Sequence, residues 1–363
     1  MLHTLIFVRL ETYIMADLSQ FDPNSVGNPN NNVFGLPFSE DDARLIIVPV
    51  PWEVTVSYNG GTARAPDSIF KASYQVDLFD IDTKDIWKEG FYMQAPELKI
   101  LSKSDYLRKE AELYINYISH GDKVEDNKFM VKTLKEINAG SVWLNEWVYQ
   151  QTKSLLEKGK LVVLLGGDHS TPFGFFKAIA EKHGEFGLLQ IDAHCDLREA
   201  YEGFTYSHAS IMYNALKEIP FITKLVQVGA RDYCKEEIDF IQSANGRVKT
   251  LFDSQIKERI YEGQTWQRMV QELVDSLPQK VYLSFDIDGL EPGLCPNTGT
   301  PVHGGLQPDQ VFYLLKAIIN SGRHFIGFDL NEVGVSQNEW DENVGARILY
   351  KLCNLLMAAN KKQ

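Results

Sequence analysis

The sequence has few cysteines, a deficit of basic residues and no long apolar run. Its four cysteines among 363 residues show no paired spacing such as CxxC, so we expect no disulfide framework and a reducing, cytoplasmic setting. Lys and Arg number 36 against 49 Asp and Glu, and the formal net charge of -13 argues against a nucleic acid or an anionic membrane as partner. The same charge is compatible with a small cationic substrate.

The amino terminus does not have the features of a signal peptide or a membrane span. Its apolar run is interrupted by Arg9 and Glu11 and is too short for either. Met15 begins a more typical amino terminus, so residues 1–14 need not belong to the natural chain. The Asn-, Pro- and Gly-rich residues 22–33 predict an arm without regular structure, within an amino-terminal extension of residues 1–40.

Short apolar runs alternate with amphipathic helical patterns through the rest of the chain. Several runs are apolar on both faces, as central strands of a parallel sheet must be. The predicted strands are residues 44–50, 161–166, 186–192, 224–230, 247–252, 280–288 and 323–330. This alternation predicts one three-layer α/β/α domain over residues 41–363 with a central, mostly parallel sheet. Residues 85–158 interrupt the rhythm and predict a helical insert packed beside the sheet.

The segment LLQIDAHCDLRE (188–199) ends a predicted strand with three ionisable residues, Asp192, His194 and Asp196. In extended backbone these alternate residues project to the same face, whereas Cys195 projects to the other. Two carboxylates and an imidazole are costly to bury together unless a cation binds them. The spacing therefore predicts part of a metal site.

Three other predicted strands end in the same way, and the carboxyl ends of parallel strands lie at one edge of a sheet. GGDHS contains Asp168 and His169, FDIDG contains Asp286 and Asp288, and FDLNEV contains Glu332. Each of these motifs alone is more often a turn or a helix cap. Their repetition on successive strand ends predicts a shared site whose ligands are His169, Asp192, His194, Asp196, Asp286 and Asp288. Four carboxylates and two imidazoles suit two divalent ions that share bridging carboxylates, such as Mn²⁺, Ni²⁺ or Fe²⁺.

The blocks GGDHS, DAHCD and SFDIDGLEPGLCPNTGTPVHGGL resemble the signature blocks of the ureohydrolase superfamily, the arginases and agmatinases, over about residues 40–355. The resemblance implies an arginase-like fold, a binuclear centre held by the same six residues, and hydrolysis of a guanidinium compound to urea. It also implies that His208 shuttles a proton, that Glu332 binds the substrate guanidinium, and that the protein is a homo-oligomer, a trimer or a hexamer.

The substrate is less sharply predicted. The segment DLREAYEGFTYSHAS resembles the agmatinase version of its loop and lacks the Asn/Ser/Thr-rich loop of arginases, so arginine is not expected. The segments FGLPF and NEWDENVGARILYKLC resemble an agmatinase-like branch that includes nickel-dependent guanidine hydrolases. This branch makes free guanidine with Ni²⁺ the first expectation, agmatine the second and a guanidino acid the third, with Mn²⁺ as the alternative metal.

Four further residues are candidates for supporting roles. Asp168 either orients His169 or caps the helix that starts near Thr171. Trp52, Thr55 and Trp340 are candidates for the substrate pocket, although each could serve in packing. Three alternative functions fit the sequence less well. A single-zinc deacetylase would need only one Asp-His-Asp set, whereas both carboxylate pairs are present here. A binuclear phosphatase would need basic residues at this edge of the sheet, which is acidic, and a non-enzymatic relative would have lost some of the six ligands.

Overall fold

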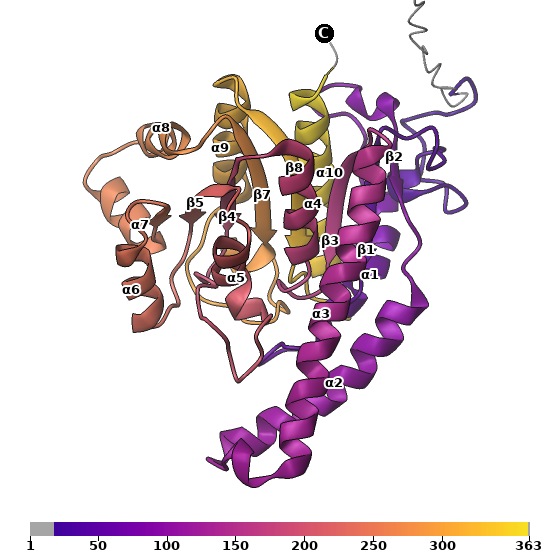
Figure 1. Ribbon diagram of the computed structural model, residues 1–363. Coiled ribbons are helices and arrows are strands. Elements are labelled where there is room, and N and C mark those ends of the chain that lie inside the picture. Colours follow the sequence, from indigo (N-terminus) through magenta and orange to yellow (C-terminus); the bar gives the residue numbers. More distant parts are fainter. Residues whose placement is uncertain (1–17, 362–363) are drawn as a thin grey trace, which may run out of the picture.

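An eight-stranded parallel sheet forms the centre of the molecule (Figure 1). The structure is a computed structural model that describes residues 18–361. The order across the sheet is β2-β1-β3-β8-β7-β4-β5-β6. The strands are β1 (Leu45–Val50), β2 (Phe91–Met93), β3 (Leu161–Gly166), β4 (Phe186–Ile191), β5 (Ile222–Val228), β6 (Val248–Leu251), β7 (Lys280–Asp286) and β8 (His324–Asn331). All seven predicted strands are present, with bounds that differ by two residues or fewer.

Helices cover both faces of the sheet, which confirms the predicted three-layer α/β/α architecture (Figure 1). Helices α3, α4 and α5 lie over one face, and α1, α9 and α10 lie over the other, with α8 packed against α9. The helices are α1 (Ala65–Ala72), α2 (Leu98–Ser119), α3 (Lys128–Glu157), α4 (Phe173–His183), α5 (Ile211–Glu218), α6 (Lys235–Ser243), α7 (Asp253–Tyr261), α8 (Trp266–Ser276), α9 (Pro308–Asn320) and α10 (Trp340–Ala359).

The ends of α8 and α9 show why the chain folds this way locally. The Thr265 side chain accepts a hydrogen bond from the Arg268 backbone N–H and so caps the first turn of α8. Pro308 starts α9, where its missing N–H costs nothing, and Gly322 follows that helix with a φ of 81°, a left-handed conformation open to glycine. Each helix buries one apolar stripe against its neighbours.

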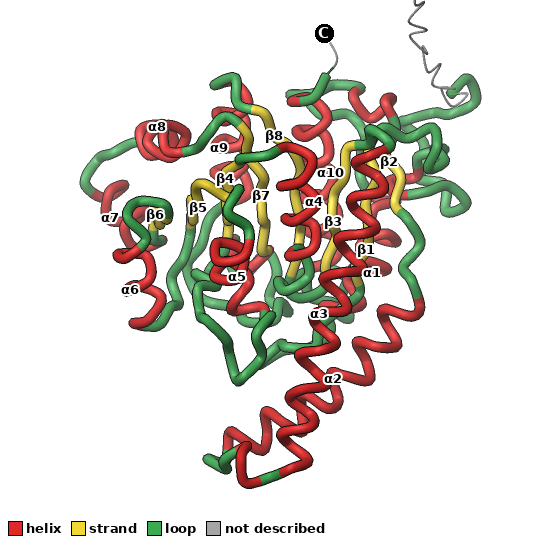
Figure 2. Tube along the Cα trace, in the orientation of Figure 1, coloured by secondary structure: helices red, strands yellow, loops and turns green. Residues whose placement is uncertain are grey.

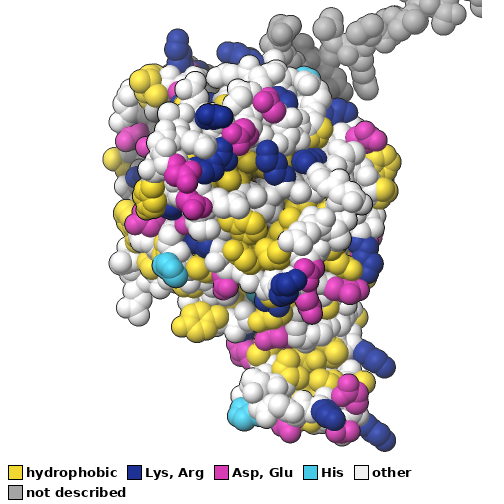
Figure 3. Space-filling view, turned by 90° about the vertical axis from the view of Figure 1, so that its left-hand side faces the viewer, with side chains coloured by type: hydrophobic (Ala, Val, Ile, Leu, Met, Phe, Trp, Pro, Cys, Tyr) yellow, Lys and Arg dark blue, Asp and Glu magenta, His cyan; other side chains and the backbone are white. Residues whose placement is uncertain are grey.

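The segment 85–158 is more than the helical insert that the sequence predicts. It contains α2 and α3, but it also contains β2, which pairs with β1 at the edge of the sheet. A strand of three residues is too short to show an alternating pattern in the sequence. Helices α2 and α3 pack as a hairpin that extends past the carboxyl ends of the strands (Figure 2) and protrudes from the body of the molecule (Figure 3).

The amino-terminal extension is described from residue 18 onward, and residues 1–14 lie outside the described residues. As predicted, residues 22–32 form turns and irregular backbone. A single 3₁₀ turn, Val33–Gly35, follows them, and the side chains of Val33 and Phe34 are buried in the core. Among the described residues, no helix is long and apolar enough to cross a membrane.

The strand order creates one crevice at the carboxyl edge of the sheet. After β3 the chain passes over the positions later filled by β8 and β7 and enters β4, and from there it continues outward to β5 and β6. The connection after β4 leads to β5 on one side, whereas the connection after its neighbour β7 leads to β8 on the other side. Open α/β sheets bind ligands at such a reversal. The loops that follow the central strands gather at this edge (Figure 2).

Candidate metal centre

The candidate site residues, which are the six predicted metal ligands and Glu332, follow four adjacent strands, β3, β8, β7 and β4, at this crevice. His169 lies just beyond β3, Asp192 directly follows β4, and Asp286 is the last residue of β7. Glu332 directly follows β8, between the other strands. Residues from four distant parts of the sequence thus converge on one place.

The backbone after β4 differs from the extended segment that the sequence predicts. The strand ends at Ile191, and Asp196 has a φ of 55°. A left-handed conformation is unusual for an aspartate and turns the chain sharply. Asp192 and Asp196 still face the same imidazole, but a turn brings them together rather than strand alternation. Glu332, with a φ of 60°, is also left-handed, and such backbone strain is typical of functional sites.

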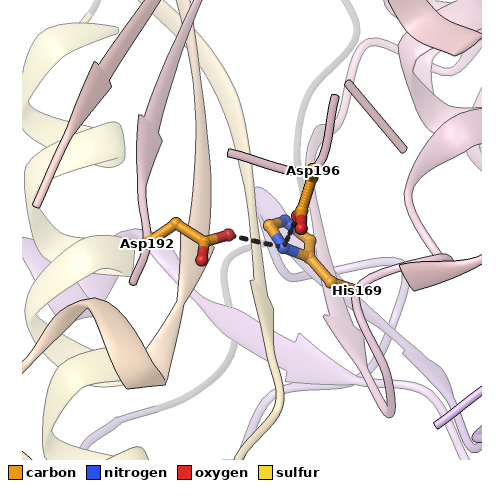
Figure 4. Close-up of side chains that lie close together, drawn as sticks. All are labelled: His169, Asp192 and Asp196. Atoms are coloured by element: carbon orange, nitrogen blue, oxygen red, sulfur yellow. Dashed lines mark ion pairs between the residues drawn. The ribbon is translucent and has the colours of Figure 1, made fainter. Parts of the chain in front are cut away.

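Three carboxylates surround one nitrogen of His169. Its Nδ1 lies 3.0 Å from Asp192 Oδ2, 3.0 Å from Asp196 Oδ2 and 3.3 Å from Asp286 Oδ2. Figure 4 shows Asp192 and Asp196 approaching the ring from opposite sides. All four side chains are almost fully buried. One ring nitrogen cannot donate hydrogen bonds to three carboxylates at once. The nitrogen and the three carboxylate oxygens are therefore available together as ligands for a cation.

A second cluster shares Asp192 with the first. The Nδ1 atom of His194 lies 3.4 Å from Asp192 Oδ1 and 3.1 Å from Asp288 Oδ2. Asp192 therefore offers one carboxylate oxygen to each cluster, as a bridging ligand does. Five of the six predicted ligands form two adjoining groups of potential metal-binding atoms, His169, Asp192, Asp196 and Asp192, His194, Asp288. The sixth, Asp286, lies beside His169 of the first group.

Hydrogen bonds behind His169 determine which of its nitrogens carries a proton. Ser284 Oγ donates to Asp329 Oδ1 at 2.9 Å, and it lies 2.8 Å from His169 Nε2. Because the hydroxyl proton of Ser284 is used on Asp329, the hydroxyl accepts from an Nε2–H of His169. The Nδ1 atom then has a lone pair directed at three carboxylates, a repulsive arrangement that a metal ion makes favourable. This nitrogen has no hydrogen-bond partner among the described residues.

The electrostatics of the buried carboxylates agree with a bound cation. Burial and the neighbouring Asp192 carboxylate raise the pKa of Asp196 to about 8. Burial and the neighbouring carboxylates of Asp288 and Asp192 hold the pKa of Asp286 well above its ordinary value. These acids cannot all be ionised at neutral pH unless positive charge lies among them. Hard oxygen ligands with two imidazoles fit divalent ions such as Mn²⁺ or Ni²⁺.

His208 lies beside this centre and contacts Thr55. The backbone N–H of His208 donates to Thr55 Oγ1 at 3.1 Å, and its ring Nδ1 lies 3.5 Å from the same hydroxyl. The ring also lines the pocket described below. Burial and the nearby imidazoles of His194 and His169 lower the pKa of His208 to about 3, so the ring is neutral at pH 7.

Glu332 presents a free carboxylate oxygen next to the metal ligands. Its Oε1 accepts from the His169 backbone N–H at 2.8 Å, and Thr298 Oγ1 donates to its backbone carbonyl at 2.7 Å. Its Oε2 is buried without a partner among the described residues. Burial and the Asp168 carboxylate raise the pKa of Glu332 well above its ordinary value. A bound cation would pair with this oxygen and restore its charge.

A pocket of about 230 Å³ opens beside His194 and Asp196. Its wall includes Asp232, a residue that the sequence does not single out. The exposed carboxylate of Asp232 makes no hydrogen bond or ion pair with any described residue. Arg198 also lines the pocket, where its guanidinium lies 4.8 Å from the centre of the Tyr201 ring. Asp232 escapes sequence reasoning because a lone acid after β5 is common on protein surfaces.

The predicted supporting residues separate into two groups. Thr55 lies at the centre, since it contacts His208, but the indoles of Trp52 and Trp340 lie elsewhere. Trp52 is fully buried and packs on Trp143, whereas Trp340 is 44% exposed and donates from Nε1 to the Gly293 carbonyl. Neither is among the residues that line this pocket, and a role for either in substrate binding stays a prediction.

Asp168 forms a turn next to the centre. Its Oδ1 accepts from the Ser170 backbone N–H at 3.0 Å and from the Ser170 hydroxyl, and its Oδ2 lies 3.4 Å from the Thr55 backbone nitrogen. Among the described residues the ring of His169 is contacted by Ser284 instead. Asp168 therefore closes a turn with Ser170 and does not cap α4, which begins at Phe173 without a side-chain cap hydrogen bond. The orienting role of Asp168 stays a prediction.

Comparison with known proteins agrees with the geometry of the site. The model of the arginase family matches residues 43–354. The N(1)-aminopropylagmatine ureohydrolase of Thermus thermophilus is 30% identical over 317 residues, covering 87% of this chain and 91% of that protein. The agmatinase of Neisseria meningitidis is 27% identical over 93% of this chain and 96% of its own length. The crystal structure of agmatine ureohydrolase from Thermoplasma volcanium superposes with a TM-score of 0.63 at 22% identity, covering 88% of this chain and 90% of that one.

Proposed function

This chain belongs to the arginase family, and from that membership we propose that it releases urea from agmatine, or from a similar guanidinium compound with a cationic tail, at a centre of two divalent metal ions. The chain is a hydrolase of the ureohydrolase group, which acts on carbon–nitrogen bonds in linear amidines. The observation that carries the choice of substrate is the unpaired Asp232 carboxylate in the pocket beside the metal ligands.

The buried ligand clusters support the assignment of two ions. We assign His169, Asp192, Asp196 and Asp286 to one ion and Asp192, His194 and Asp288 to the other, with Ni²⁺ or Mn²⁺ as the metal. Bound divalent ions supply a strongly acidified water and electrostatic stabilisation of the developing negative charge. The protein contributes fixed ligand positions and a partly enclosed site.

Glu332 orients the guanidinium group. Its unpaired Oε2 accepts hydrogen bonds from the planar cation, while the His169 backbone N–H holds its Oε1 in place. The left-handed backbone at Glu332 fixes the direction of this carboxylate. The guanidinium carbon is thereby presented to the attacking water in one orientation, which converts binding energy into correct alignment.

His208 transfers the proton that the leaving amine needs. The neutral ring accepts a proton during the attack and then donates it to the departing nitrogen, because an amine cannot leave as an anion. With Nδ1 beside the Thr55 hydroxyl, Nε2 is the ring nitrogen that is available to the substrate. Its lowered pKa makes the transfer to the more basic amine favourable.

Asp232 is suited to bind the distal ammonium group of agmatine. The carboxylate lies in the same pocket as His194 and His208, so a substrate with its guanidinium at the metal ligands can reach Asp232 with a flexible tail. Free guanidine, which the sequence resemblance ranks first, has no tail and leaves this carboxylate without a role. It remains the second candidate. A homo-oligomeric state, a trimer or a hexamer, and a cytoplasmic location both remain predictions.

A panel of substrates tests this proposal. Urea release is measured for agmatine, guanidine, 4-guanidinobutyrate and arginine with enzyme loaded with Mn²⁺ or with Ni²⁺, and we expect agmatine to give the highest kcat/KM. The Asp232→Asn variant should then lower kcat/KM for agmatine by about three- to tenfold, the range for a partly exposed charge pair.

Guanidine serves as the control in the same experiment. Because guanidine has no tail, its kcat/KM should be the same for the wild-type enzyme and for Asp232→Asn. A higher kcat/KM for guanidine than for agmatine in the wild type would restore guanidine as the substrate. An equal loss on both compounds would mean that Asp232 supports the fold of the pocket and does not bind the tail.

A further inference from the structure

Three polar side chains occupy directly paired positions on neighbouring strands below the metal ligands. Gln190 on β4 pairs in register with Gln227 on β5, which pairs with Thr250 on β6. The two glutamines are almost fully buried, and their neighbours along each strand, Leu189 and Ile191 on β4 and Val226 and Val228 on β5, are apolar. A buried amide requires hydrogen bonds at both ends, so two buried glutamines next to a threonine in one row need a physical explanation.

The hydrogen bonds determine the orientation of each amide. Gln227 Nε2 donates to the Cys195 backbone carbonyl at 2.7 Å, and a carbonyl can only accept. The opposite atom of that amide is therefore Oε1, which accepts from the Thr250 hydroxyl at 2.6 Å. Gln227 Nε2 also donates to Gln190 Oε1 at 2.6 Å, so the amide nitrogen of Gln190 faces the other way.

The last donor in this row contacts two candidate metal ligands. Gln190 Nε2 donates to Asp192 Oδ2 at 2.8 Å and to Asp196 Oδ2 at 3.3 Å. These are the same two oxygens that lie 3.0 Å from His169 Nδ1. The two N–H groups of one amide therefore hold two mutually repelling carboxylates in the arrangement that a metal ion requires.

We propose that Gln190, Gln227 and Thr250 form a positioning chain that sets the metal affinity of the His169 cluster. The chain runs from the Thr250 hydroxyl through two amides to the carboxylates of Asp192 and Asp196, and each link fixes the orientation of the next. None of the three residues is a metal ligand or touches substrate. The inference rests on the metal centre proposed above, and it adds that residues two strands away control how tightly that centre binds its ion.

Metal titrations of the apoprotein with Mn²⁺, read by competition with a chelating indicator, test the chain. The Thr250→Val variant keeps the shape of the side chain and leaves Gln227 Oε1 without its donor, so we expect the dissociation constant to rise about three- to tenfold. The Gln190→Leu variant removes the contact with the carboxylates, and we expect a rise of about 10–100-fold, as is typical when partners of metal ligands are replaced.

Thr223→Val is the matched control. Thr223 lies on β5, the strand of Gln227, but its hydroxyl donates to the Phe186 backbone carbonyl and takes no part in the chain. Both threonine variants lose one hydrogen bond and should lower the melting temperature of the apoprotein to a similar extent. Only Thr250→Val should change the metal affinity.

A variant that combines Thr250→Val with Gln190→Leu shows whether the two residues act on metal affinity through one chain or independently. If the effect of Thr250 travels through Gln190, Thr250→Val should have no effect on metal affinity in the Gln190→Leu background. An unchanged dissociation constant for Thr250→Val in the wild-type background would refute the chain, and so would an equal loss in both backgrounds. Because the assay needs no substrate, these results are distinct from a failure of the proposed reaction, which would appear as tight binding of two ions without urea release.

Discussion

Replacing Asp192 with alanine is expected to remove both metal ions and to reduce urea release by about 10³-fold or more, since several electrostatic contributions are lost together. The reason is that Asp192 gives Oδ2 to the His169 cluster and Oδ1 to the His194 cluster. No other described side chain contributes to both groups of metal-binding atoms. Elemental analysis after dialysis against a weak chelator measures the ions that remain on each chain.

Asp288→Ala is the matched control for this variant. Asp288 belongs to the His194 cluster alone, where its Oδ2 lies 3.1 Å from His194 Nδ1. We expect this variant to lose one ion and to keep the other. If Asp192→Ala retained two ions, or lost no more than Asp288→Ala, the bridging role of Asp192 would be wrong.

The His208→Ala variant is expected to keep two metal ions and to lose about 10²–10⁴-fold in kcat, the usual range for a general acid or base. No described ligand cluster includes His208, so the metal content should not change. Added imidazole should restore part of the activity, because the small cavity left by the ring lies at the pocket. Urea release with and without imidazole measures both effects.

His183 provides the control for this experiment. It ends α4, outside the pocket, so His183→Ala should keep full activity and should not respond to imidazole. Burial and nearby lysines lower the pKa of His183 to about 4, which shows that a lowered pKa alone does not identify a proton shuttle. Undiminished kcat in His208→Ala would remove His208 from the mechanism.

The sequence predicts the sheet well because its central strands are buried on both faces. The run Leu161–Gly166 is apolar throughout, and Phe186–Ile191 is apolar except for Gln190, so both have few alternatives to a central strand. Residues after such strands necessarily lie at one edge of a parallel sheet. The convergence of His169, Asp192 and Asp286 therefore follows from strand assignment together with the residue types.

The parts that the sequence does not predict depend on turns and on neighbouring strands. The division of the Asp192 oxygens between two clusters depends on the left-handed turn at Asp196, which has no signature in the pattern of apolar residues. The order β3-β8-β7-β4 depends on chain topology and brings Glu332 between the metal ligands. The sequence offers one further signal, a glutamine between apolar residues near the end of each of two strands, and this signal is informative only once the register of β4 and β5 is known.

The direction of the Trp52 side chain is also not predictable from the sequence. Trp52 lies close to the site in sequence, beside Thr55, and its backbone carbonyl accepts from the Asp168 N–H at 2.8 Å. Its side chain points into the core between the sheet and α3 and not toward the pocket. Proximity of the backbone therefore does not decide the direction of a side chain, which depends on local turns that the sequence alone leaves open.

Titration of the metal-free protein with Mn²⁺ or Ni²⁺, with urea release from agmatine measured after each addition, tests the central claim most directly. The account predicts no activity without metal and a rise that reaches its plateau at two ions per chain, since the ligands form two clusters joined by Asp192. A plateau at one ion per chain, or urea release by the metal-free protein, would contradict it.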